Sequence, residues 1–149
     1  MADLRPADDN SITNEELLYI RIFPSPDVLR PVDSGGYRPM SGAMRATHRD
    51  EPLSVDLSSV CAPEQTRDRG TDGNFHVARL VVGEIRAAGF RIVRNPIVAG
   101  QVPNPAHALI YGSRKDFAGN IVGGLTGGEV ETLARLARVI IVTPQPREE

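Results

Sequence analysis

The chain has 149 residues, of which 40% are hydrophobic, 24% charged and 5% aromatic. This length and composition predict one globular domain. The formal net charge of −2 argues against a strongly basic nucleic-acid-binding protein. We find no run of about 18 apolar residues and a polar N-terminus, so we expect neither a membrane helix nor a signal peptide. The single cysteine excludes an internal disulfide and favours a reducing, cytoplasmic location.

The first half of the chain contains two strand patterns separated by a long polar segment. Residues 1–14 are acidic and polar, and we expect them to form a disordered leader. Residues 17–23 (LLYIRIF) are rich in β-branched and aromatic side chains, and residues 53–57 (LSVDL) alternate apolar and polar side chains. Both patterns predict strands. Residues 24–52 are rich in proline and glycine, which is typical of a functional or mobile loop.

Three helices are expected further along the chain. A short helix over 63–69 begins at Pro63, a residue that suits the first helical position. A longer helix is predicted from about residue 75 to a glycine cap at 89, because apolar residues fall three and four positions apart. These residues are Val77, Leu80, Val81, Ile85 and Ala88. Thr126 and Glu129 have the spacing of a capping box, which predicts a third helix through about residue 138.

Strands are also predicted at 90–93, 107–112 and 138–143, where apolar runs follow a helix or a proline-rich loop. Because helices and strands are interspersed, the sequence predicts an α+β or small α/β fold. We expect a single domain over 15–144, with a mixed sheet of about five strands and two main helices. The last residues, 145–149, are expected to form a tail.

His107 is the first candidate for a functional residue, because it begins a predicted strand directly after an Asn-Pro turn. Imidazole titrates near neutral pH and can act as a general base or a ligand, although a histidine here can also simply cap the strand. We predict a polar cleft around His107 that is lined by Arg21, Arg38 and Asp56 and takes a protein partner or a small polar ligand. Residues 75–149 carry 9 basic against 6 acidic side chains, whereas residues 1–74 are net acidic. The two halves can pair with each other within one domain, or the second half can present a mildly basic face to an anionic ligand.

Cys61 stands two residues before Pro63, at the start of the predicted short helix. Helix N-termini favour thiolates, although an unpaired cysteine is more often buried and inert. With His107 in HALIYG, this arrangement resembles that of papain-like cysteine peptidases. The resemblance implies a hydrolase or acyl-transfer enzyme in which Cys61 is the nucleophile, His107 carries the proton, and Asp116 or Asn120 orients the imidazole. The glycine- and tryptophan-flanked cysteine motif of that family is absent.

Arg21 in YIRIF, together with Glu129 and Glu131 near the end of the chain, is similar to the pattern of ADP-ribosyltransferase-like domains. That resemblance implies an enzyme that uses a nicotinamide dinucleotide, with Arg21 holding a phosphate. The segment SVDLSS departs from the Ser-Thr-Ser pattern of those domains. Capping of a helix also explains the glutamates.

The segments LLYIRIFP, LSVDLSSV and PNPAHALIYG together resemble small uncharacterised bacterial proteins. This resemblance implies a cytoplasmic accessory or interaction protein and carries no catalytic residue. Sixteen arginines against one lysine agree with a bacterial chain from a GC-rich genome. His48, His76 and His107 lie far apart in the sequence, so we predict no metal site, and we predict no cofactor.

Overall fold

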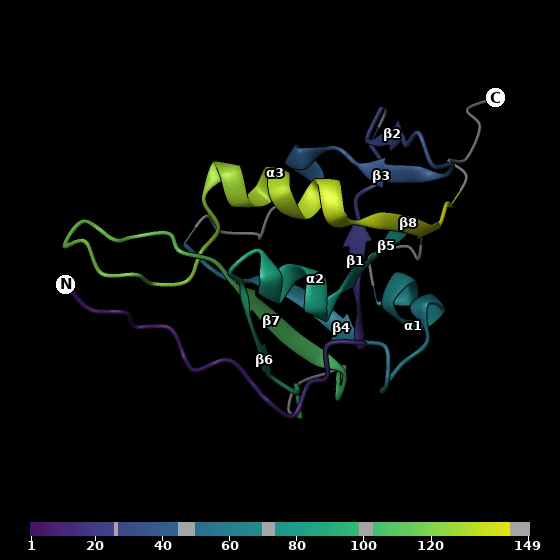
Figure 1. Ribbon diagram of the computed structural model, residues 1–149. Coiled ribbons are helices and arrows are strands. Elements are labelled where there is room, and N and C mark those ends of the chain that lie inside the picture. Colours follow the sequence, from purple (N-terminus) through teal and green to yellow (C-terminus); the bar gives the residue numbers. More distant parts are fainter. Residues whose placement is uncertain (26, 45–49, 70–73, 99–102, 144–149) are drawn as a thin grey trace.

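A six-stranded sheet forms the centre of the computed structural model, with the strand order β6-β7-β4-β1-β5-β8 (Figure 1). The structure describes all residues except 26, 45–49, 70–73, 99–102 and 144–149. The strands are β1 (Leu17–Ile22), β4 (Leu53–Leu57), β5 (His76–Val81), β6 (Arg91–Arg94), β7 (His107–Tyr111) and β8 (Arg138–Ile141). A separate hairpin consists of β2 (Leu29–Pro31) and β3 (Tyr37–Pro39). The helices are α1 (Pro63–Asp68), α2 (Val82–Ala87), α3 (Gly127–Leu136) and the 3-10 helix η1 (Ser41–Ala43).

The α+β class and the single domain that the sequence predicts are confirmed. All neighbouring strands of the large sheet are antiparallel. The predicted loop at 24–52 contains the β2–β3 hairpin and η1, although part of it lies outside the described residues, as does the predicted tail at 145–149. None of the helices that the structure describes is long and apolar enough to cross a membrane.

The two faces of the sheet differ in what covers them. Helices α2 and α3 pack on one face (Figure 1), where alternate residues of the central strands form the main hydrophobic core. The fully buried side chains of this core include Leu18, Ile22, Leu57, Leu80, Ile85, Ile92, Ile110 and Leu133. Burial of one such aliphatic side chain stabilises the fold by roughly 1.5–3 kcal/mol. This face therefore supplies most of the hydrophobic stabilisation and leaves the opposite face free for polar groups.

The longest predicted helix is wrong over its first half. Residues 76–81 form strand β5, which pairs along its whole length with β1, and only residues 82–87 are helical. Val77 contacts the small cluster on one face of the sheet, while Leu80 belongs to the main core on the other. A strand that is buried on both faces loses its apolar–polar alternation, so its sequence also fits a helical spacing. The extra strand raises the expected five strands to six.

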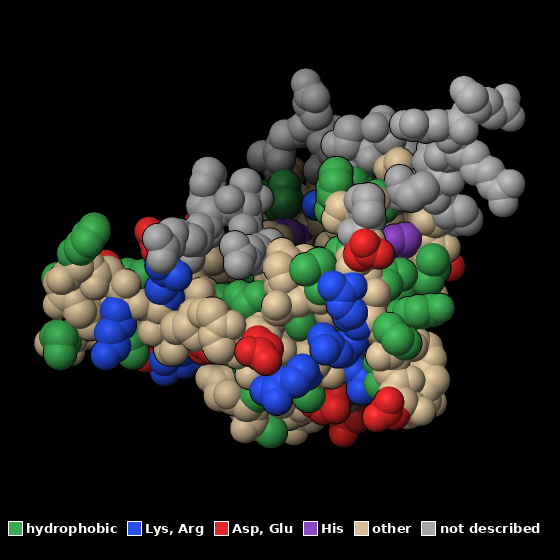
Figure 2. All heavy atoms as spheres, turned by 90° about the horizontal axis from the view of Figure 1, so that it is seen from above, with side chains coloured by type: hydrophobic (Ala, Val, Ile, Leu, Met, Phe, Trp, Pro, Cys, Tyr) green, Lys and Arg blue, Asp and Glu red, His purple; other side chains and the backbone are tan. Residues whose placement is uncertain are grey.

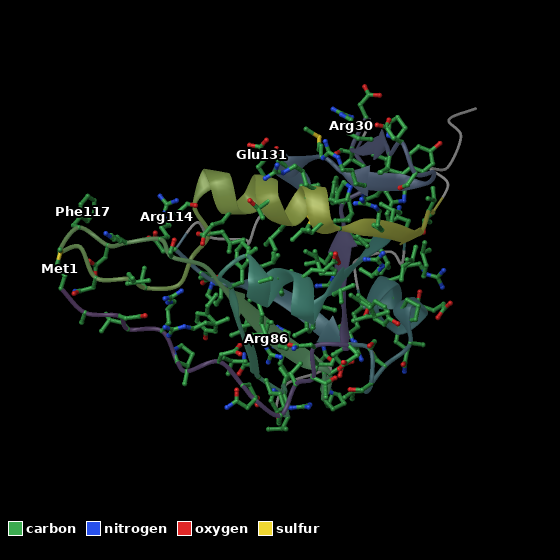
Figure 3. The ribbon with its side chains drawn as sticks, viewed as in Figure 1. Met1, Arg30, Arg86, Arg114, Phe117 and Glu131 are labelled. Carbon is green, nitrogen blue, oxygen red and sulfur yellow. The ribbon has the colours of Figure 1, made fainter. Side chains whose placement is uncertain are left out.

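The N-terminal segment lies along the sheet edge, which differs from the disordered leader expected for residues 1–14. The backbone N–H of Asp9 donates to the carbonyl of Ile92 at 2.9 Å, and the backbone N–H of Ile92 donates to the carboxylate of Asp8 at 2.8 Å. Arg86 of α2, labelled in Figure 3, donates to the same carboxylate at 2.9 Å. Because β6 is an edge strand, these bonds satisfy backbone groups that a bare edge would leave open to pairing.

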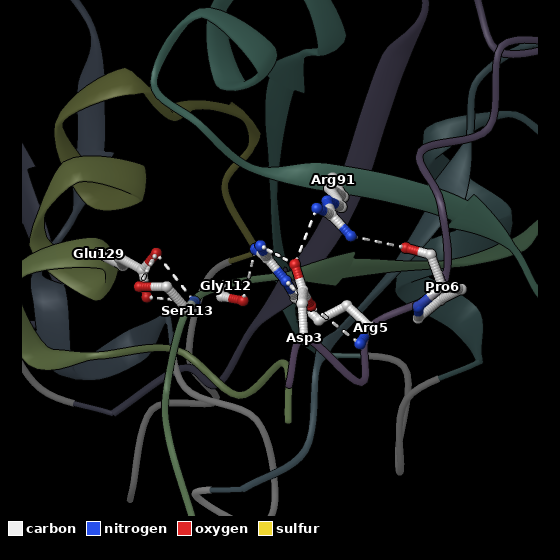
Figure 4. A network of polar contacts seen from close by, with 7 residues as sticks. All are labelled: Asp3, Arg5, Pro6, Arg91, Gly112, Ser113 and Glu129. Carbon is white, nitrogen blue, oxygen red and sulfur yellow. Dashed lines mark hydrogen bonds and ion pairs between the residues drawn. The ribbon is translucent and has the colours of Figure 1, made fainter. Parts of the chain in front are cut away.

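An arm, formed by residues 1–5 and 112–123, extends from the body of the molecule (Figure 1). Asp3 anchors its base, because its carboxylate accepts a hydrogen bond from Arg91 of β6 at 2.9 Å (Figure 4). Hydrophobic side chains stand exposed at its far end (Figures 2 and 3), where Phe117 is fully exposed. The arm therefore lies outside the hydrophobic core.

Candidate functional site

A row of polar side chains crosses the three central strands on the face opposite the main core. Tyr19 of β1 pairs directly with Asp56 of β4, and Asp56 pairs with His107 of β7. Directly paired residues of antiparallel strands project to the same face, so these three side chains lie side by side. Because Tyr19 lies 37 residues before Asp56, and Asp56 lies 51 residues before His107, the sequence alone does not indicate that they are neighbours.

Asp56 is the centre of a buried hydrogen-bond network. Its Oδ2 accepts from the Thr66 hydroxyl and from Nη1 of Arg69, each at 2.7 Å, and its Oδ1 accepts from the side-chain amide of Asn104 at 2.8 Å. The Asn104 Oδ1 in turn accepts the backbone N–H of Ala106 at 3.1 Å, which fixes the orientation of that amide. Asp56 is only 6% exposed, so its carboxylate is committed to positioning these donors.

Three members of this network were missed by the sequence analysis, and each comes from a short segment. Thr66 lies on α1, and Arg69 caps the same helix three residues later. Because residues three apart share a helix face, this spacing could have indicated that both side chains point the same way. Asn104 stands in the Asn-Pro turn just before β7, where asparagine often binds nearby backbone groups. The sequence does not indicate that all three side chains donate to the carboxylate of Asp56.

The row borders a pocket of about 320 Å³. Its lining residues are Tyr19, Arg21, Ser54, Val55, Asp56, Thr66, Arg69, Ile97, Asn104 and His107. Arg21 and Ser54 are exposed, so the pocket opens to solvent at the end of β1. The structure thus brings together three of the residues predicted for the cleft, namely Arg21, Asp56 and His107. The role of these residues in binding stays a prediction.

Arg38, the fourth predicted member of the cleft, lies elsewhere. It belongs to β3 of the separate hairpin, and its guanidinium donates to the carbonyl of Pro39 at 3.3 Å. The expectation that it lines the His107 cleft is therefore wrong. The position of this hairpin depends on packing of β3 against α3 and β8, which the sequence pattern does not encode.

His107 is held by its backbone-facing nitrogen. The ring Nδ1 lies 2.8 Å from the carbonyl oxygen of Asn95, which can only accept a hydrogen bond, so Nδ1 carries a proton. The Nε2 atom makes no hydrogen bond with the described residues. It is therefore the atom that can meet a ligand, as an acceptor in the neutral ring and as a donor in the charged one. The contact that the capping alternative predicts for His107, a hydrogen bond to a loop carbonyl, thus occurs at Nδ1.

The predicted catalytic group of Cys61, His107 and Asp116 shows no hydrogen bond among its members. Cys61 is buried beside Tyr19, and its Sγ lies 3.7 Å from the Thr66 hydroxyl. Asp116 lies in the arm, where its carboxylate accepts the backbone N–H of Asn120 at 3.0 Å. The two residues expected to orient the imidazole thus bond to each other, and the Asn95 carbonyl takes that place.

The glutamates of the ADP-ribosyltransferase resemblance lie on α3, which covers the opposite face of the sheet from Arg21. Glu129 completes the capping box with Thr126 and also accepts the backbone N–H of Ser113 at 3.0 Å (Figure 4). Glu131 is exposed on the same helix (Figure 3). Neither glutamate lines the pocket.

Burial and neighbouring charges act together on the pocket's ionisable groups. Burial raises the pKa of the Tyr19 hydroxyl, and the neighbouring Cys61 and Glu64 raise this pKa further, so Tyr19 stays neutral. Burial lowers the pKa of Arg69, but its contacts with Cys61 and Asp56 outweigh burial and raise that pKa overall. Arg69 therefore stays protonated in its 2.7 Å ion pair with Asp56.

Metal ligands are not grouped in the part of the chain that the structure describes, since no three of its His, Cys, Asp and Glu side chains could hold a metal ion. Comparison of the chain with family models, with curated proteins and with solved structures finds no match. The resemblances drawn from the sequence therefore stay predictions, and the function must be argued from the pocket itself.

Proposed function

We propose that the protein is a small binding module whose pocket beside His107 takes a small polar ligand through an anionic group. The observation that supports this proposal is that the pocket's one described carboxylate is already occupied by hydrogen-bond donors. Among the described residues that line it, Asp56 is the sole carboxylate, and Arg69, Thr66 and Asn104 already occupy it. These described lining residues thus leave no free carboxylate to repel an anion.

Two groups remain available to such a ligand. Arg21 is exposed at the mouth of the pocket, and no carboxylate among the described residues forms an ion pair with it. His107 offers Nε2, which donates to an anion once the ring is protonated. A guanidinium with several fixed donors binds phosphate or carboxylate through paired hydrogen bonds. Together these groups support an anion site on one side of the sheet.

The proposal concerns binding and not covalent chemistry, because Cys61 lies packed beside Tyr19 instead of lining the pocket. Bacterial origin and a cytoplasmic location are further parts of this proposal. They rest on the arginine-rich composition and on the single, unpaired cysteine. A protein partner that presents an acidic side chain is a second source of such an anionic group.

The experiment is a titration with inorganic phosphate at constant ionic strength, followed by backbone amide chemical shifts. We expect the shifts to concentrate on the strands that carry Arg21 and His107. Arg21→Ala should weaken binding about tenfold or more, because a hydrogen bond to a charged group contributes roughly 1.5–3 kcal/mol. Arg135→Ala is the matched control, since Arg135 is an exposed arginine on α3. Equal affinity for phosphate in both variants would refute the proposed site.

A further inference from the structure

An aromatic pair lies next to the anion site and belongs to neither hydrophobic cluster. The rings of Phe23 and Phe75 meet edge to face, with centroids 5.8 Å apart. The guanidinium carbon of Arg21 stands 5.8 Å from the centroid of the Phe75 ring. Arg21 therefore joins the pocket to this pair, because it lines the first and contacts the second.

The strand period explains why these residues share one face. Tyr19, Arg21 and Phe23 alternate along β1 and its continuation, so all three project to the face opposite the main core. Phe75 directly precedes β5, whose first residue, His76, pairs with Ile22. A ring at Phe23 thus lies one strand repeat, roughly 7 Å, beyond the cation at Arg21.

Packing does not account for Phe23. Its side chain is 65% exposed although it stands at the end of a central strand, and the main core lies on the other side of the sheet. Single exposed apolar residues are common, but the Phe23 ring contacts Phe75, whose ring makes a cation–π contact with Arg21 of the pocket. Ser54 and Tyr19 also bring hydroxyl groups to the pocket, and neither hydroxyl is bonded to any described residue.

We propose that the anionic ligand of this pocket is a free mononucleotide, which deepens, and rests on, the proposed anion-binding function. The phosphate binds Arg21 and the Nε2 of His107, the sugar faces the Ser54 hydroxyl, and the base stacks on the exposed ring of Phe23. Every nucleobase has a π-face, and stacking on an aromatic side chain is a recurrent way in which proteins hold it. The net charge of −2 favours a single nucleotide over a long polyanionic strand.

The test compares AMP, ribose 5-phosphate and adenosine by isothermal titration calorimetry. We expect AMP to bind about tenfold or more tighter than ribose 5-phosphate, because stacking of one base on an aromatic ring contributes a difference of this size. Phe23→Ala should remove this advantage while leaving the affinity for ribose 5-phosphate unchanged, and Phe23→Tyr should keep it. Phe117→Ala is the matched control, because Phe117 is an exposed phenylalanine at the end of the arm (Figure 3).

The outcomes separate this inference from the proposed function. If AMP and ribose 5-phosphate bind equally and Phe23→Ala changes neither, stacking is refuted and the anion site stands. If adenosine binds as tightly as AMP, the anion site itself is refuted. Binding of none of the three compounds refutes both proposals. A 5′-phosphorylated single strand that binds tighter than AMP would overturn the assignment of a free nucleotide.

Discussion

Replacement of Asp56 by asparagine tests whether the buried carboxylate organises the pocket. The two side chains have nearly the same shape, but asparagine has one acceptor oxygen and one donor nitrogen. Arg69 donates to one carboxylate oxygen and Asn104 donates to the other. The Asn104 amide cannot turn round without losing its bond from the N–H of Ala106. In Asp56→Asn, the new amide nitrogen is a donor and must therefore face the donor of either Arg69 or Asn104.

The expected cost follows from this mismatch. Loss of one hydrogen bond to a charged group costs about 1.5–3 kcal/mol, and a donor left buried without a partner costs about 1–3 kcal/mol more. The Arg69 side chain keeps 18% of its exposure, so water screens part of the loss. We therefore expect the free energy of unfolding to fall by about 2–4 kcal/mol.

Urea unfolding followed by far-ultraviolet circular dichroism measures this change, and the slope with urea shows whether the transition stays two-state. A double-mutant cycle with Thr66→Val adds a sharper criterion, because both residues belong to one network. Their effects should be non-additive by about 0.5 kcal/mol or more. A loss below about 1 kcal/mol for Asp56→Asn, or strictly additive effects, would refute the claim that this carboxylate holds the donors together.

Two further changes test the base of the arm and the pH dependence of stability. Gly112→Ala should destabilise the fold by about 1–3 kcal/mol in urea unfolding, because its Cβ would lie 2.7 Å from the carbonyl oxygen of Gly124. Gly128→Ala, with open space around it, should be neutral, and equal effects would contradict the argument. Burial raises the pKa of Glu16, but bonds from Ser58 and Ser59 outweigh burial and hold that pKa below its ordinary value. This stabilisation is present above pH about 4.3 and disappears as the pH falls through the lower folded-state pKa. Unfolding of Glu16→Gln and the native chain should therefore differ at pH 7 and converge in acid, and a constant difference would count against it.

Local signals in the sequence are sufficient to predict much of the fold. The capping box of Thr126 and Glu129 and the glycine cap at Gly89 both occur as expected, because each depends on residues within one turn. β4 agrees with prediction residue for residue, since only one of its faces meets the main core. β5 was missed because its two faces are both covered, and periodicity then fits two structures.

The candidate site could be predicted only in part, because its geometry depends on strand register. The sequence marks His107 and Asp56 as polar residues in apolar strands, which suffices to single them out. It does not show that β4 and β7 pair with these two residues directly opposite each other. The contacts of Cys61 likewise depend on how α1 docks on β1 and β5. Docking of short segments is a tertiary effect that local propensity does not encode.

The division between the two faces of the sheet explains why a pocket can exist in so small a chain. The main core stabilises the sheet through burial of aliphatic side chains on one face. The opposite face can therefore carry polar groups without opening a cavity in that core. The segments around the pocket are short, and Thr66, Arg69 and Asn104 all converge on Asp56. The buried carboxylate thus holds the segments of the polar face together through hydrogen bonds, as apolar packing holds those of the other face. The Asp56 carboxylate also pairs with the Arg69 guanidinium and balances its charge. Arg21 is therefore the lining cation without such a partner among the described residues, and a ligand meets it first.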